Sequence, residues 1–237
     1  MIRMIFVLFL TFMTIKTFAA ESDLYNFSWL DKDKEIYVLQ NRKFKKQQRF
    51  FVSGGFGKTL SGAFVDSTSM QLRAGYFYSE ELGAEFIYSS NSGEENDTAA
   101  SVRNSNGGGS GSIPFRRIVN DYIGVMATWA PFYSKINTFN TILYVDWIFG
   151  LGFAKLNETN NGPEVRAGSP NPGLTIDESH TGLMWDVSTK FYINQSWSIR
   201  ADINGILYQA APARESGSES DQLYSNIDLT FAVQFDL

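Results

Sequence analysis

The chain contains no cysteine and a single histidine among its 237 residues. Without cysteine it can form neither a disulfide framework nor a lipoprotein anchor, and a zinc site made of histidine and cysteine ligands is excluded. No run of 18 apolar residues follows residue 20, so the sequence predicts no transmembrane helix. Glycine (20 residues) and aromatic residues (15%) are abundant, whereas charged residues make up only 19%, which is typical of β-sheet proteins with many turns.

Residues 1–20 have the pattern of an export signal. Arg3 supplies a positive charge, the ten residues MIFVLFLTFM form an apolar run too short to span a bilayer, and small residues precede a cleavage point after Ala19. The alternative is a buried N-terminal strand or helix. Export leaves two fates for the chain, a soluble β protein or a membrane-spanning β-barrel.

The mature chain shows apolar residues at every second position, which is the pattern of strands with one apolar face. The segment QLYSNIDLTFAVQFDL is the clearest case, since all but one of its odd-numbered residues from Leu223 to Leu237 are apolar and most of its even-numbered ones are polar. Eight segments show this alternation, at residues 50–58, 69–78, 82–89, 120–130, 140–153, 182–193, 197–208 and 222–237.

The connections between these segments alternate in length. Short ones are expected at 79–81, 131–137 and 194–196, and long ones at about 59–68, 90–115, 154–179 and 209–221. This layout predicts an all-β fold over residues 49–237, an eight-stranded antiparallel transmembrane β-barrel with short periplasmic turns and long extracellular loops.

Charged residues on the polar faces favour a barrel over a sandwich, because a sandwich core would bury them without partners. We expect seven of them to face the lumen: Arg73, Glu85, Asp146, Asp186, Lys190, Arg200 and Asp202. Their charges nearly cancel, which favours a salt-bridge network that fills the lumen. A narrow conducting pore is the alternative.

The orientation follows from the even strand number, which places both chain ends in the periplasm. Residues 21–48 are then a periplasmic segment. An outward-facing aromatic girdle is expected near the short turns, made of Tyr76, Tyr78, Trp129, Trp197 and Phe235. A basic run precedes the first strand, and we expect it at the periplasmic mouth beside lipid headgroups or paired with Glu80 and Glu81; it comprises Arg42, Lys43, Lys45, Lys46 and Arg49. A nucleic-acid partner is not expected for an exported chain.

Three stretches, KEIYVLQNRKFKKQQRF, GYFYSEELGAEFIYS and WAPFYSKI, resemble the small outer-membrane β-barrel proteins of myxobacteria and Bdellovibrio-like predatory bacteria. The resemblance runs roughly from residue 35 to 237, and its wider kinship is with eight-stranded barrels of the OmpA/OmpX kind. The C-terminal FAVQFDL is similar to the signal read by the barrel assembly machinery. The resemblance implies the outer membrane of a Gram-negative bacterium and implies no reaction.

Site chemistry is sparse in this sequence. His180 is expected to be a loop-rim residue. The acidic residues Asp177 and Glu178, like those at 94–97, could bind a divalent cation, but they lack the spacing of a calcium loop, so solvated acidic loops are expected. We therefore predict no catalytic residue, no metal and no cofactor. The main hypothesis is a non-enzymatic outer-membrane protein with a structural or surface role, whose partners are membrane lipids and the assembly machinery. The alternatives are a small pore or a homo-oligomer that encloses a central space, and a lipid-modifying barrel enzyme.

Overall fold

The computed structural model describes residues 42–104, 113–138, 141–168, 173–212 and 221–237. The predicted export signal, most of the predicted periplasmic segment and the glycine-rich stretch 105–112 lie outside the described residues. The chain divides into two units, Met1–Lys43 and Phe44–Leu237. Within the described ranges, no helix has both the length and the apolar character needed to cross a membrane.

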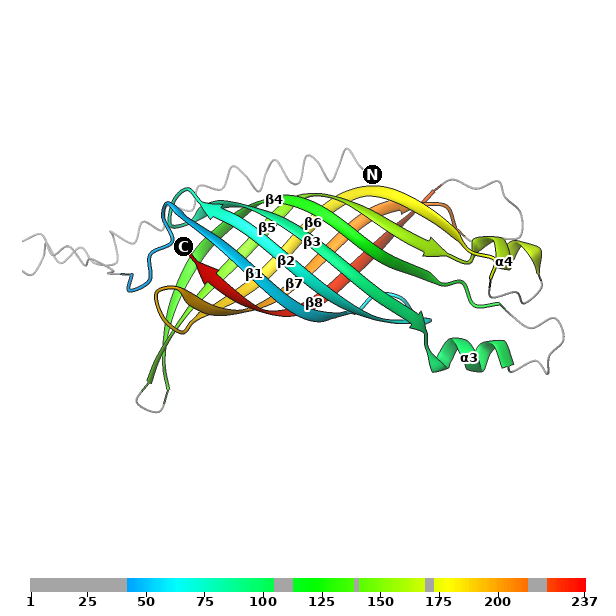
Figure 1. Ribbon diagram of the computed structural model, residues 1–237, viewed down its shortest axis with the longest axis horizontal. Helices are drawn as coiled ribbons and strands as arrows, with labels where there is room; N and C mark the ends of the chain where they lie inside the picture. The colour runs from blue at the N-terminus through cyan, green and yellow to red at the C-terminus, as the bar shows by residue number, and fades with distance from the viewer. Residues whose placement is uncertain (1–41, 105–112, 139–140, 169–172, 213–220) are drawn as a thin grey trace, which may run out of the picture. The chain divides into compact units, whose positions relative to one another are not determined.

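The second unit is a closed antiparallel β-barrel, as the sequence predicts (Figure 1). Each strand pairs with its neighbours in the chain, and β1 pairs with β8 to close the ring. The strands are β1 (Arg49–Thr59), β2 (Val65–Phe77), β3 (Leu82–Glu95), β4 (Arg117–Thr138), β5 (Thr141–Asn160), β6 (Ile176–Tyr192), β7 (Trp197–Ala210) and β8 (Gln222–Asp236).

Side chains alternate between the two faces of the barrel wall along most of each strand. On β8, Phe231 and Val233 are 61% and 52% exposed on the outside, whereas Thr230 and Gln234 are fully buried inside. The other strands also have an apolar outer face. Their inner face is mixed, because it carries the buried polar residues and also an apolar cluster that includes Met126, Leu156, Met184 and Ile206. Since soluble proteins rarely expose so large an apolar wall, this surface suits contact with lipid.

Two kinds of connection distinguish the two ends of the barrel. At the short-turn end, which carries the β2–β3 and β6–β7 turns, side chains cap the turns, as where Asn194 Oδ1 accepts hydrogen bonds from the Ser196 and Trp197 amides. At the long-loop end lie two helices, α3 (Asp97–Asn104) and α4 (Gly162–Ala167) (Figure 1). The Ala99 amide donates to Asn96 Oδ1, which caps the start of α3.

The predicted short connection at 131–137 is wrong. Strand β4 continues to Thr138 and pairs with β5 from Phe132–Trp147 onward, after a register shift between Trp129 and Phe132. The irregularity contains Pro131, which has no amide hydrogen to donate to a ladder and therefore suits a bulge. The β4–β5 hairpin consequently projects beyond the other short turns (Figure 1).

The long connections are also shorter than predicted. Strand β3 reaches Glu95, β5 reaches Asn160, and β6 already begins at Ile176. These extensions carry polar residues on both faces, so they lack the apolar alternation by which a strand is recognised. Backbone pairing with the neighbouring strand still satisfies their amides and carbonyls, and the ladder continues beyond the apolar band.

Candidate functional site

The centre of the barrel interior holds a compact cluster of buried charges from four strands. Arg73 Nη1 lies 2.8 Å from Glu85 Oε1 and 3.1 Å from Asp186 Oδ1. Arg200 spans the same space, with Nη1 3.1 Å from Glu85 Oε2 and Nη2 2.8 Å from Asp202 Oδ1. The structure thus brings together five of the seven charged residues expected in the lumen.

Uncharged polar side chains extend this cluster across the lumen. Arg73 Nη2 donates to Gln71 Oε1 at 3.0 Å and to Asn204 Oδ1 at 3.1 Å. The Tyr122 hydroxyl accepts from Asn204 and donates to Asp228 Oδ2 at 2.8 Å. The sequence analysis did not single out these uncharged partners, although all of them lie at inward positions of the predicted strands.

The other two predicted lumen residues, Asp146 and Lys190, lie nearer the short-turn end and have different partners. Lys190 Nζ lies 2.8 Å from Asp236 Oδ1, a residue of β8 that the sequence analysis placed only on the polar face. Asp146 is buried, accepts a hydrogen bond from the Tyr192 hydroxyl at 2.7 Å, and forms an ion pair with Lys46.

Lys46 belongs to a segment that enters the short-turn mouth, defined here as the plug, residues 44–48. The Phe44 ring is stacked on Tyr192 with a centroid distance of 4.8 Å, and Lys46 is only 3% exposed. The Lys46 and Gln47 amides donate to the Glu80 carboxylate at 3.2 and 3.3 Å. Lys46 is therefore buried in the barrel interior, where its ammonium group pairs with Asp146 and its amide contacts Glu80, one of the two acidic partners expected for the basic run.

The remaining basic residues of the run stay at the surface. Lys43 and Lys45 are exposed, and Arg42 and Arg49 are half-buried. Arg49 Nη1 donates to the Gln195 carbonyl oxygen at 3.1 Å, which ties the start of β1 to the β6–β7 turn.

The five residues predicted as an aromatic girdle lie near the short-turn end and point outward. Tyr76 packs on Phe50 with ring centroids 4.6 Å apart, and Trp197 packs on Phe235 at 4.9 Å. Tyr78 and Trp129 are 74% and 51% exposed. Paired aromatic rings are thus present on the outer wall at this level.

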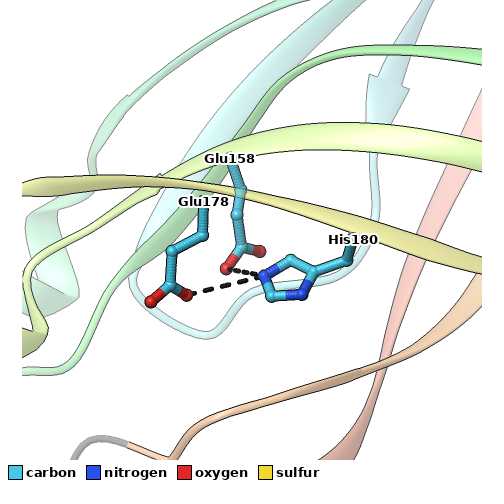
Figure 2. Close-up of side chains that lie close together, drawn as sticks. All are labelled: Glu158, Glu178 and His180. Carbon is cyan, nitrogen blue, oxygen red and sulfur yellow. Dashed lines mark hydrogen bonds and ion pairs between the residues drawn. The ribbon is translucent and has the colours of Figure 1, made fainter.

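At the long-loop end, the side chains of Glu158, Glu178 and His180 lie close together on the inner face of the barrel (Figure 2). Their strands place them there, because Glu158 on β5 pairs directly with Glu178 on β6, and His180 follows two residues later on the same face. His180 Nε2 lies 3.2 Å from Glu158 Oε1 and 3.5 Å from Glu178 Oε2. These three ligand atoms all lie within 4.8 Å of one another.

Neighbouring residues hold this group in place. Glu158 is fully buried, and its carboxylate has two further polar partners. Arg117 Nε lies 3.0 Å from Glu158 Oε1, and the Tyr208 hydroxyl donates to Glu158 Oε2 at 2.9 Å. The His180 ring lies 5.4 Å from the Tyr208 ring.

The sequence analysis missed this group because it placed Glu158 in a loop. The available signal was the continued inward alternation of Leu156, Glu158 and Asn160 after the apolar part of β5.

The expectation that the residues at 94–97 are solvated acidic groups holds only in part, since Glu95 pairs with Arg103 and Arg116. Arg103 also lies 2.7 Å from Glu164, which connects α3 to α4.

The described part of the barrel has a hollow in its interior and another on its outer wall. A cavity of about 180 Å³ lies at the long-loop end, and its wall includes Ser67, Arg117, Tyr208 and Tyr224. A shallow depression of about 840 Å³ lies on the outer wall, where the small side chains Ala74, Ala84 and Ala127 adjoin larger apolar ones. The wall of the smaller cavity includes no residue of the central charge cluster, whereas Glu85 borders the depression.

Comparison with known proteins gives both sequence and structural matches. Residues 38–235 match the family described as "Outer membrane protein beta-barrel domain". No curated protein sequence matches the chain. Among solved structures, the chain is similar to the N-terminal β-barrel domain of Pseudomonas aeruginosa OprF, with 14% identity and a TM-score of 0.45, covering 81% of this chain and 98% of that chain.

Two further solved structures are similar. Neisserial surface protein A has 10% identity and a TM-score of 0.46, with 79% of this chain and 96% of that chain covered. The E. coli outer membrane protein W has 15% identity and a TM-score of 0.39, with 81% and 99% covered.

Proposed function

Because this chain belongs to the outer membrane protein β-barrel domain family, we propose that it is a non-enzymatic barrel of the Gram-negative outer membrane with a closed lumen. Its role is structural or lies in interactions at its outer surfaces. The observation that carries this proposal is the charge cluster of Arg73, Glu85 and Arg200, which bridges the lumen from β2 and β3 to β7.

The physical reason is that an eight-stranded barrel is only wide enough for its own side chains. Arg73 and Arg200 both reach Glu85 from different strands, and each is at most 3% exposed. An ion or solute could pass only if these pairs separated, and an unpaired buried charge costs about 3–5 kcal/mol. This barrier supports a closed barrel over a small pore.

The plug adds a second closure at the short-turn mouth. Phe44 lies against Tyr192 and Tyr144, with ring centroids 4.8 and 5.2 Å away, and Lys46 pairs with Asp146. A solute that entered from the short-turn mouth would therefore meet the packed Phe44 ring and the Lys46–Asp146 ion pair before it reached the central cluster. This arrangement supports a role that requires no passage through the lumen.

The orientation and partners follow from the same proposal. Residues 1–20 act as the export signal, the short turns face the periplasm, and the acidic long loops face the exterior. Membrane lipids contact the apolar wall, and the barrel assembly machinery reads the C-terminal FAVQFDL. The kinship with barrels of predatory bacteria stays a prediction.

Electrical recording in planar lipid bilayers tests the closed lumen. The wild-type protein is expected to give no stable conductance steps at any voltage. The positive control is a variant in which the paired carboxylates are removed together with their cations, so that no buried charge is left unpaired. Its substitutions are Arg73→Ala, Glu85→Ala, Asp186→Ala, Arg200→Ala and Asp202→Ala in the central cluster and Phe44→Ala, Lys46→Ala and Asp146→Ala at the plug, and heat-modifiable gel migration verifies that it is folded. Reproducible wild-type steps that follow protein concentration would contradict the proposal and favour the porin-like alternative.

A homo-oligomer is the second candidate, and the depression on the outer wall favours it. Its small residues Ala74, Ala84 and Ala127 leave room for the protruding side chains of a second copy. Mass measurement in lipid nanodiscs distinguishes the two cases. A strict monomer at all protein-to-lipid ratios removes this candidate and leaves the closed, surface-acting barrel in place.

A further inference from the structure

We propose that Glu158, Glu178 and His180 form a binding site for a divalent transition-metal ion of the zinc type (Figure 2). The site lies at the long-loop end of the interior, apart from the central charge cluster. It is independent of whether the lumen conducts, so it adds a property to the proposed barrel without depending on its closure.

The distances between the ligand atoms suit one bound ion. Zinc binds histidine nitrogen and carboxylate oxygen at about 2.0–2.2 Å, so two ligands of a tetrahedral site lie about 3.4 Å apart. His180 Nε2 lies 3.2 Å from the Glu158 oxygen and 3.5 Å from the Glu178 oxygen. The histidine can therefore share an ion with each carboxylate with little movement of these pairs.

The ligands stand on paired strands, which makes their arrangement rigid. Glu158 and Glu178 are direct partners in the β5–β6 ladder, and Leu156 is the partner of His180, so the histidine is diagonal to Glu158. Like charges placed directly opposite each other destabilise a sheet unless a cation lies near them. The ladder thus fixes two carboxylates at a spacing that favours a cation between them.

The local charge leaves room for such a cation. Arg117 compensates one of the two carboxylates, with Nε 3.0 Å from Glu158 Oε1, and its guanidinium is stacked on Tyr224 at 4.1 Å from the ring centroid. With a neutral imidazole, the three ligands and Arg117 carry a net charge of −1, the sum of −2 and +1. A divalent ion reverses this small imbalance, whereas a second divalent ion would be repelled.

Hydrogen bonds around the ligands orient them. The Tyr208 hydroxyl donates to Glu158 Oε2 at 2.9 Å, and Asn160 Nδ2 donates to Glu178 Oε2 at 3.0 Å. Outer hydrogen bonds of this kind hold ligating carboxylates in metal sites. The imidazole has its Nε2 directed at both carboxylates, a position that suits a proton or a metal ion on this atom.

The donor set indicates the class of ion. One imidazole and two carboxylates suit zinc and similar transition metals, whereas calcium and magnesium prefer sites made of oxygen alone. Glu178 and His180 retain 29% and 15% side-chain exposure, which gives an ion access from the long-loop end and leaves coordination positions for water.

Isothermal titration of the full-length protein in detergent with Zn²⁺ alone tests the site. We expect one high-affinity site per chain, with Ca²⁺ and Mg²⁺ at least tenfold weaker. His180→Gln and Glu178→Gln each retain side-chain size and should weaken Zn²⁺ binding at least tenfold. The matched control is Glu94→Gln with Asp97→Asn, which removes acidic groups at the same end and should leave the affinity unchanged.

Three outcomes would overturn the inference. Wild-type protein that shows neither a heat of Zn²⁺ binding nor visible Co²⁺ bands has no site. Unchanged affinity in His180→Gln means that zinc binds elsewhere, and equal losses in the Glu94/Asp97 control mean a diffuse acidic surface. Heat-modifiable gel migration verifies that each variant is folded, and Co²⁺ absorption spectra give a second readout, since loss of the imidazole ligand changes the visible bands.

Discussion

Individual charged residues in this barrel are arranged in pairs that the sequence predicts only in part. The inward direction of Arg73, Glu85 and Arg200 follows from their alternation with apolar neighbours. Their pairing depends on the stagger of the strands, which decides the residues that meet at one height of the lumen. Lys190 therefore pairs with Asp236, a residue of the β8 polar face, and Asp146 with Lys46, which precedes the strands altogether.

At this scale, Arg200→Leu is expected to destabilise the barrel strongly. The substitution leaves Glu85 and Asp202 buried with fewer positive partners, and breaking a buried pair costs about 3–5 kcal/mol. The free energy of unfolding in urea, measured in lipid bilayers, should fall by this amount. Arg166→Gln on the exposed face of α4 is the control and should change it by less than about 0.5 kcal/mol. Equal free energies of unfolding for Arg200→Leu and the wild type would show that the ion pairs of Arg200 do not stabilise the barrel.

The strands as whole elements are predicted in position but not in length. The apolar alternation predicts where each strand lies, whereas backbone pairing with the neighbouring strands determines where it ends. The alternation from 120 to 130 predicts the central part of β4, yet the strand runs from Arg117 to Thr138. Its outer parts lack the apolar signal, and Pro131 is misread as a turn because a bulge accommodates it. The same limit hid the position of Glu158 near the end of β5. The plug carries no strand pattern and escapes prediction for the same reason.

The plug gives the prediction that belongs to the scale of elements. Lys46→Met removes the cation that pairs with buried Asp146 and should loosen residues 44–48 without opening the strands. The Gln48 amide, which donates to the Phe77 carbonyl at 2.8 Å, should exchange with solvent at least tenfold faster, while β8 amides keep their rates. Lys45→Met, at an exposed neighbouring position, is the control. Identical exchange in the two variants would mean that Lys46 does not hold the plug.

For the molecule as a whole, the apolar outer wall determines where the barrel can reside. Val125, at mid-height on β4, is 58% exposed and has Phe86 and Phe153 as its strand partners. Farther along the wall, Gln209 on β7 is exposed and polar, outside this apolar band. The fold class and the closed ring are predictable from the sequence because this alternation recurs in all strands. The long-loop end is less predictable, since the Glu158, Glu178 and His180 group arises from register and not from composition.

Placement of this wall in the hydrocarbon of a bilayer is tested by a charge at two heights. Val125→Arg should lower the free energy of unfolding in bilayers by about 2–4 kcal/mol, because it places a charged guanidinium group in the hydrocarbon at the midplane of the bilayer. Gln209→Arg, nearer the long-loop end, should cost about 0–1 kcal/mol. Urea titrations into lipid vesicles, monitored by tryptophan fluorescence, give both values. Equal losses of unfolding free energy at the two positions would contradict a membrane-spanning band centred on Val125. A larger loss at Val125 than at Gln209 would place Val125 nearer the midplane of the bilayer.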